Sequence, residues 1–298
     1  MLIKNRYYRP SHIPEKYQKA FNDPEIEISY DMAQEVFNKS DYTDPAMRGR
    51  QSVNPLNKLG FCIARESAGE IVITELGNQF LEAEQDFSSI FFKSLLKLQF
   101  PNPLNKDFSA KDGFNVSPLI ATMHLIAKVN AIEPGGLTQD EFCLFIPSLI
   151  DFHWIDGYVK QVFEYRKAKV KKDFIYNFAK NFYSVDYPSH KQISNFFEYG
   201  DNIMRYFRFT KFFTIIRKKF GSDWRIDLEP TRKVEIENLL KTFDGCAIEF
   251  SSDIDFFHFF YDTKQPILPW DDLTGYKKIV ENLLEILIEI QQKHRIQL

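Results

Sequence analysis

The sequence predicts a mainly α-helical fold with small β-hairpins (α+β), built as two winged-helix-type units in tandem plus a C-terminal helical linker. Three observations predict it. Apolar residues recur at helical spacing over much of the chain, two segments alternate in the manner of hairpins, and each hairpin follows a helix. We expect the first unit to span residues 1–115, the second 116–233 and the linker 234–298.

The composition is that of a folded globular protein, since 44% of the 298 residues are hydrophobic. No apolar run approaches the ~20 residues of a membrane helix, and the N-terminus lacks the apolar core of a secretory signal. We therefore expect a cytoplasmic protein with no membrane partner. The three cysteines lie far apart without a CxxC pair, which predicts core residues rather than disulfides or zinc ligands.

The charge is distributed unevenly along the chain, although the net charge is only −3. Residues 160–233 hold seventeen Lys and Arg against eight Asp and Glu, and the segments on either side are acidic. Such an asymmetry points to a polyanionic partner on one face, or else to a set of solvated helix faces.

In the first unit, residues 29–38 have the apolar spacing of a helix. Farther on, Asn54 can cap a helix, Pro55 suits a first helical turn, and Gly60 suits the left-handed position after the end. These signals predict a short helix of six or seven residues.

Residues 61–73 alternate around a turn at 66–69 and predict a β-hairpin. Thr74 is then placed to cap a further helix, and residues 87–99 continue as a strongly apolar helix. A short helix, a hairpin and another helix in this order are typical of a winged helix.

The second unit begins with a helix from Pro118, which the glycines at 135 and 136 interrupt. Thr138 and Glu141 form a capping-box pattern for the next helix, and the pair resembles a helix-turn-helix. Residues 156–183 predict one further helix, which carries the basic run 166–172.

Residues 191–208 form an amphipathic helix when placed at about 100° per residue. One sector is apolar and is expected to face the core: Ile193, Phe196, Phe197, Gly200, Ile203, Met204 and Phe207. The opposite sector is polar: Lys191, Asn195, Glu198, Asn202, Arg205 and Tyr206, with Arg208 at its flank. Two strands about a turn at 220–223 follow. A winged helix reads DNA with such a helix and hairpin, although winged folds that bind proteins have the same periodicity.

Several motifs are similar to one known family. They are KLGFCIARESAGEIVITELGNQFL (58–81), FFKSLLKLQFPNP (91–103) and IMRYFRFTKFF (203–213), with weaker similarity in RPSHIPEK (9–16) and LPWDD (268–272). With these motifs the chain resembles the N-terminal recognition region of the AlwI-like type II (type IIS) restriction endonucleases and of related site-specific nicking endonucleases. The resemblance extends over nearly the whole chain.

The resemblance implies an enzyme that binds double-stranded DNA at a short asymmetric site and cuts outside it. In that family, cleavage belongs to a separate C-terminal PD-(D/E)xK domain that uses Mg²⁺. This chain ends about where a linker to such a domain would begin, so we expect no cofactor here. The nuclease domain or a second subunit is the further partner expected.

Candidate DNA contacts follow from these considerations. In the first unit they surround the short helix and its wing: Arg48, Arg50, Gln51, Asn54, Lys58 and Arg65. In the second unit the expected groove contacts are Asn195, Asn202, Arg205 and Arg208. The expected backbone contacts are Lys211, Arg217, Lys218, Lys219, Trp224 and Arg225.

No residue is assigned a catalytic or metal-binding role. The segment SSDIDFFHFFYDTK (251–264) imitates a D…DxK pattern, but it lacks the leading Pro, and exposed acids around a buried aromatic stripe explain it better. The alternative function is a protein-interaction scaffold. It would use winged helices and the apolar repeat within 273–290 to bind another subunit.

Overall fold

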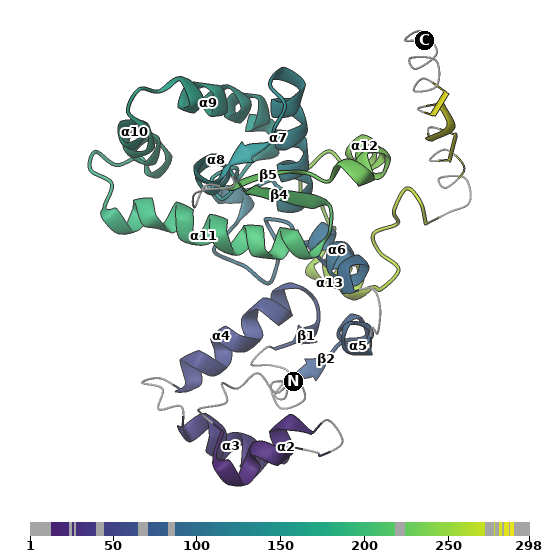
Figure 1. The fold of residues 1–298 in the computed structure, drawn as a ribbon. Helices are drawn as coiled ribbons and strands as arrows, with labels where there is room; N and C mark the ends of the chain where they lie inside the picture. Colours follow the sequence, from purple (N-terminus) through teal and green to yellow (C-terminus); the bar gives the residue numbers. More distant parts are fainter. Residues whose placement is uncertain are drawn as a thin grey trace. The chain divides into compact units, whose positions relative to one another are not determined.

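The computed structural model describes residues 13–23, 26, 28–39, 45–64, 71–82, 87–217 and 224–271, and positions 277, 280, 281, 283–285, 287 and 288. It is mainly helical with small antiparallel sheets, as predicted (Figure 1). The chain divides into two compact units, residues 1–78 and 79–298.

The first unit contains a small helical core and a short hairpin. Its helices and strands are η2 (Glu15–Tyr17), α2 (Gln18–Asn22), α3 (Tyr30–Lys39), α4 (Pro45–Lys58), β1 (Cys62–Ile63) and β2 (Val72–Ile73). Phe21 from α2 and Val36 from α3 are buried in one apolar cluster. Because both helices contribute to it, neither one has to be stable alone.

Helix α4 is longer than the six or seven residues predicted from Asn54 and Pro55. It has fourteen residues, and Pro55 lies inside it. The helix begins at Pro45, where a missing N–H has no intrahelical acceptor to lose, and it continues through Pro55, so the start predicted at Asn54 was wrong. Gly60 has a φ of 78°, so the predicted left-handed residue after the helix is confirmed.

The predicted hairpin is confirmed as β1 and β2, which pair antiparallel with Cys62 opposite Ile73. Helix α5 (Glu75–Glu82) follows, and the Thr74 hydroxyl caps it as predicted. The Thr74 hydroxyl accepts from the Gly77 N–H at 3.0 Å and donates to the Gly60 carbonyl at 2.6 Å. One side chain therefore joins the start of α5 to the end of the α4 segment.

The second unit surrounds α7 (Pro118–Ile132), a helix buried on most of its surface. The other described elements of this unit are α6 (Phe87–Lys97), η4 (Ala110–Asp112), β3 (Leu137–Thr138), α8 (Gln139–Phe145), η5 (Phe152–Trp154), α9 (Ile155–Lys167), α10 (Lys171–Tyr183), α11 (His190–Phe209), β4 (Phe213–Arg217), β5 (Trp224–Leu228), η6 (Pro230–Arg232), α12 (Lys233–Thr242) and α13 (Asp253–Tyr261). The capping box of Thr138 and Glu141 at the start of α8 is confirmed.

The single helix predicted for 156–183 is in fact two helices, α9 and α10, which Figure 1 shows as separate rods. Ala168 and Val170 between them have extended backbone. The Lys171 ammonium donates to the carbonyls of Tyr165 and Arg166, the latter at 3.0 Å. These contacts satisfy carbonyls that the end of α9 leaves without helical partners.

Three strands form the sheet of this unit, in the order β3-β5-β4, and both pairs are antiparallel. Leu137 of β3 lies opposite Ile226 of β5, which in turn lies opposite Ile215 of β4. The close approach of the chain to β5 requires glycine at position 136, just before β3. Gly136 has a φ of 67°, and a Cβ there would lie 2.2 Å from the Ile226 carbonyl oxygen.

Lys97, at the end of α6, is a cation in the interior of this unit. The residue is only 1% exposed, and its ammonium donates to the carbonyl of Asp262, just beyond α13, at 2.8 Å. Burial lowers the pKa of Lys97 to about 8, although the nearby Asp262 charge opposes this effect.

The apolar repeat predicted near the C-terminus lies mostly outside the described residues. Those that are described, between 277 and 288, are helical, and Val280, Leu283 and Leu287 expose 39–56% of their surface.

Candidate nucleic-acid interface

Helix α11 carries all four of the predicted groove contacts. Ser189 and Gln192 form a capping box that starts it: the Ser189 hydroxyl accepts from the Gln192 N–H, and the Gln192 side chain accepts from the Ser189 N–H at 2.8 Å. Its buried residues are Phe196, Gly200, Met204 and Phe207, all from the predicted core sector. The predicted inward face of this helix is thus confirmed.

Gly200 sets how closely α11 approaches α8. A Cβ at this position would lie 2.5 Å from the Cα and 2.7 Å from the Sγ of Cys143. No side chain fits at that distance, so the two backbones pack directly. Burial raises the pKa of the Cys143 thiol to about 12, and the charges of Asp201 and Asp140 add to the shift.

The outward face of α11 bears Asn202, Arg205 and Arg208, which are all exposed as predicted. Arg205 forms an ion pair with Asp201 one turn earlier, with Nη2 to Oδ2 at 2.6 Å, and its side chain is 66% exposed. Such an exposed pair contributes little to stability. The guanidinium can therefore exchange Asp201 for another acceptor at small cost.

The remaining predicted groove residue, Asn195, is half-buried and hydrogen-bonds to the side chain of Tyr183. Nearer the start of the helix, Lys191 and Glu198 form an exposed ion pair at 2.8 Å. The exposed arginines of α11, Arg205 and Arg208, thus lie toward its C-terminal end.

Tyr206, predicted on the polar side, stacks on Phe91 of α6 with ring centroids 6.0 Å apart and an interplanar angle of 14°. Phe209, also near Phe91, is 66% exposed. The sequence of α11 alone does not indicate this contact, because its partner ring comes from a helix more than 100 residues away.

The hairpin of β4 and β5 follows α11 directly, and Figure 1 shows it running alongside that helix. Arg217 of β4 lies opposite Trp224 of β5. The side chain of Arg217 and all of Lys218 and Lys219 are outside the described residues. Lys211, between α11 and β4, is exposed and has a φ of 59°.

Trp224 and Arg225 are both engaged within the unit. Trp224 is 8% exposed and meets Phe142 edge-on at 6.1 Å, so it belongs mainly to the core. Arg225 is half-buried, and its Nη2 donates to the Gly136 carbonyl at 3.4 Å. Neither offers the freely exposed side chain that was expected of a phosphate contact.

In the first unit, α4 carries Gln51, Asn54 and Lys58 at helical spacing, so that they share one face. Gln51 and Asn54 are exposed, and Lys58 is half-buried. Arg48 and Arg50 lie in the same helix, but their side chains are outside the description, as is all of Arg65.

A basic region that the candidate set omitted lies at the α9–α10 connection. Arg166 donates to Glu141 from Nε at 3.0 Å and Nη2 at 3.1 Å, and to the Gly136 carbonyl at 2.8 Å. Burial by itself lowers the pKa of Arg166, but hydrogen bonding to Glu141 and its charge leave it raised. The basic run 166–172 was visible in the sequence, but its position beside the hairpin was not.

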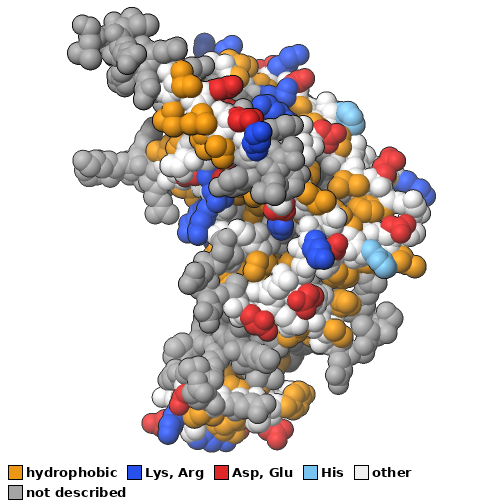
Figure 2. Space-filling model, turned by 90° about the vertical axis from the view of Figure 1, so that its right-hand side faces the viewer, with side chains coloured by type: hydrophobic (Ala, Val, Ile, Leu, Met, Phe, Trp, Pro, Cys, Tyr) orange, Lys and Arg blue, Asp and Glu red, His pale blue; other side chains and the backbone are white. Residues whose placement is uncertain are grey.

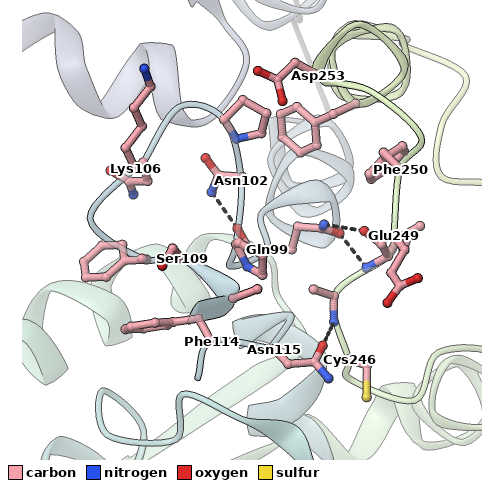
Figure 3. A pocket seen from close by; sticks show the side chains of 18 of the residues that line it. Gln99, Asn102, Lys106, Ser109, Phe114, Asn115, Cys246, Glu249, Phe250 and Asp253 are labelled. Atoms are coloured by element: carbon pink, nitrogen blue, oxygen red, sulfur yellow. Dashed lines mark hydrogen bonds between the residues drawn. The ribbon is translucent and has the colours of Figure 1, made fainter. Parts of the chain in front are cut away.

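One cavity of the second unit has a volume of about 1070 Å³ and is lined mainly by residues from 99–115 and 246–256 (Figure 3). The Gln99 amide exchanges two hydrogen bonds with the Ile248 backbone, at 2.8 and 2.9 Å, and Asn115 accepts from the Ala247 N–H. Glu249 and Asp253 also line it. Gln99 and Asn115 are engaged by the protein's own backbone, and the three acids of the lining, Asp151, Glu249 and Asp253, disfavour a phosphate.

Asp255 and Asp262, in the segment 251–264 that imitates a D…DxK pattern, take part in local hydrogen bonds. The segment contains helix α13 rather than a strand, and the Asp255 carboxylate accepts from the capping Ser252 hydroxyl at 2.8 Å. Asp262 accepts from the Lys264 N–H at 2.8 Å. Across the described ranges, no group of three or more His, Cys, Asp or Glu is arranged to hold a metal ion.

The described surface carries charges of both signs. On the face that Figure 2 shows, basic and acidic side chains are interspersed with apolar ones, and no wide area carries charge of one sign alone. None of the described helices is both long enough and apolar enough to span a membrane.

Comparison with known proteins gives one family. The model of the AlwI restriction endonuclease family matches residues 57–298, which is more than half of the chain. None of the curated proteins matches it.

Proposed function

Because the chain belongs to the AlwI restriction endonuclease family, we propose that it binds a short asymmetric site in duplex DNA for a restriction or nicking endonuclease. The observation that carries this proposal is the division of α11 into two faces. Phe196, Met204 and Phe207 are buried, while Arg205 and Arg208 are exposed next to a hairpin.

The second unit supports a winged-helix reading mode. In a winged helix, the strand after the first helix pairs with the second strand of the hairpin, and the reading helix precedes that hairpin. The order β3-β5-β4 and the position of α11 before β4 fit this scheme, with α9 and α10 as an insertion after α8. We propose that α11 enters the major groove and that the hairpin contacts phosphates.

The side chains on α11 have suitable chemistry for base reading. Arginine donates two hydrogen bonds to the O6 and N7 of guanine, whereas the asparagine amide donates to N7 of adenine and accepts from its N6 amino group. Arg205, Asn202 and Arg208 are the proposed base-reading residues, and Lys211 a backbone contact. In the first unit, Gln51, Asn54 and Lys58 on α4 form a second proposed contact surface, together with Arg48, Arg50 and Arg65.

We further propose that cleavage belongs to a PD-(D/E)xK domain outside this chain. Mg²⁺ bound there would stabilise the negative charge on the phosphate and supply an activated water. The proposal rests on the local hydrogen bonds that occupy Asp255 and Asp262. Incubation of the chain with its target duplex and Mg²⁺ tests it, since strand breaks would overturn it.

Selection from a library of random duplexes tests DNA recognition itself. We expect enrichment of one short asymmetric motif, and binding that weakens steeply with salt because phosphate contacts release counterions. Absence of enrichment at low salt, with the chain shown to be folded, would overturn the proposal.

A second candidate function is a protein-interaction scaffold, and the exposed apolar residues Val280, Leu283 and Leu287 favour it. Sedimentation of the chain without DNA separates the two functions. Tight self-association that Leu283→Glu abolishes, together with no DNA affinity, would support the scaffold.

A further inference from the structure

The basic run 166–172 contains two kinds of cation. Arg166 and Lys171 are directed into the protein, where they bind Glu141, Gly136 and the carbonyls at the end of α9. Lys167, Lys169 and Lys172 are exposed, and within the part of the chain that the structure describes they form no ion pair. The inner cations fix the connection, and the outer three leave a compact positive surface.

The Gly136 carbonyl places this surface beside the hairpin. It accepts from Nη2 of Arg166 at 2.8 Å and from Nη2 of Arg225 at 3.4 Å, so α9 and β5 meet at one oxygen atom. Arg166, Lys171, Trp224 and Arg225 also line one cavity of about 450 Å³. The α9–α10 connection therefore lies next to the end of β5 from which the hairpin tip extends.

The cavity itself is not a plausible anion site. Its three cations, Arg166, Lys171 and Arg225, face three acids, Glu133, Asp140 and Glu141, so their charges cancel. The excess positive charge is on the outer surface of the connection. A ligand attracted to it must be extended and anionic, because the three lysines are exposed rather than enclosed.

We propose that Lys167, Lys169 and Lys172 bind the phosphate backbone of duplex DNA next to the segment that the hairpin contacts. This inference rests on the proposed DNA-binding function and adds a contact surface to it. Lysine is a point charge without a fixed hydrogen-bonding fork, so these contacts position the duplex and do not read its sequence.

The size of the effect follows from counterion release. Each phosphate contact contributes about 0.9 to the slope of log affinity against log salt, so three contacts contribute about 2.7. Between about 50 and 200 mM salt, that difference amounts to about 40-fold in affinity.

The test compares the wild-type chain with a K167Q/K169Q/K172Q variant, on the selected duplex and on an unrelated one. The matched control is K111Q/K241Q/K264Q, which removes the same charge from three other exposed lysines. We expect the first variant to lose about 2.7 units of salt slope on both duplexes, with an unchanged ratio of the two affinities. We expect the control to lose less than one unit, and K167R/K169R/K172R to keep the wild-type slope.

A second readout locates the contacts. Ethylation of a contacted phosphate weakens binding, so it identifies the phosphates that the wild-type chain contacts. We expect ethylation of several of these phosphates to have no further effect on binding by K167Q/K169Q/K172Q. If this variant keeps the slope and ethylation pattern of the control, the inference is wrong while the proposed function stands. If the wild-type chain binds no duplex at all, the proposed function fails, and this inference fails with it.

Discussion

Arg166 and Glu141 form a two-point ion pair in the interior of the second unit, with N–O distances of 3.0 and 3.1 Å. Glu141 is 1% exposed, and its carboxylate also accepts from the Thr138 N–H at 2.9 Å. A single carboxylate thus completes the capping box of α8 and holds the end of α9 against it.

Replacement of Glu141 by Ala should lower the free energy of unfolding by about 3–5 kcal/mol, since it leaves a largely buried guanidinium without its counter-charge. Urea unfolding of the full chain measures this. The control is Glu133→Ala, which removes an exposed partner of the same Arg166 at 3.3 Å and should cost less than about 1 kcal/mol. Equal losses in the two variants would contradict the role given to Glu141.

Gly200→Ala should destabilise the chain by about 1–3 kcal/mol, because the new methyl group would overlap Cys143. Gly157→Ala is the matched control. Gly157 also lies in a helix, but no atom is within 4 Å of the position that its Cβ would take. That control should stabilise the chain by about 0.5–1 kcal/mol, since alanine restricts the unfolded chain and favours a helix. Thermal unfolding that shifts in the same direction for both variants would refute this account.

The stability of the chain should rise with pH between about 8 and 10.5 because of Lys97. Its pKa is about 8 in the folded state and 10.5 in the unfolded state. The unfolded chain therefore binds more protons in this window, and the free energy of unfolding increases as the pH rises through it. Below pH 8 both states are protonated, and the full cost of the buried ammonium is present.

The expected gain is about 3 kcal/mol, from about 1.4 kcal/mol for each pKa unit. Urea unfolding of the wild-type chain and of Lys97→Met, each at pH 7.5 and pH 10, isolates the contribution of Lys97. The cysteines and tyrosines titrate alike in the two chains, so their effect cancels in the comparison. If the free energy of unfolding changes with pH by the same amount in the wild-type chain and in Lys97→Met, the prediction is wrong.

Arg205→Ala should weaken binding to the selected duplex by about 1–3 kcal/mol and relax its specificity at one base pair. Lys211→Ala should weaken binding to all duplexes alike and reduce the salt slope by about 1. Affinity measured on the target, on single-base variants and on unrelated DNA separates the two effects. An Arg205→Ala chain that binds every duplex as wild type does would show that α11 does not read this DNA.

Asp201→Asn offers a complementary measurement, since Asp201 holds Arg205 in the free chain. Its removal frees the guanidinium and takes a negative charge away from the proposed interface. We expect tighter binding to the target and no loss of stability beyond about 0.5 kcal/mol, as for an exposed ion pair. Weaker binding would instead indicate that Asp201 positions Arg205 for its contact.

Local signals in the sequence were sufficient for several elements of the fold. The capping box of Thr138 and Glu141 depends on residues three apart, and the buried face of α11 depends on spacing within one helix. Each can be predicted because all of the interacting residues are near one another in the sequence.

Other elements depend on contacts between distant segments and were missed. No Gly or Pro marks the break between α9 and α10, which is completed by the contact of Lys171 with carbonyls of α9. The two residues of β3 form a strand only because β5 pairs with them. Tyr206 and Trp224 likewise became packed residues through Phe91 and Phe142, which lie in other helices.

The strand order β3-β5-β4 also has a consequence for the chain as it is synthesised. Gly136 and Arg225, which meet beside the sheet, are 89 residues apart. At roughly 5–20 residues per second, a ribosome needs several seconds to cover that distance. During that time β3 has no strand to pair with, so α7 and α8, which both contact β5, are synthesised before the sheet can close.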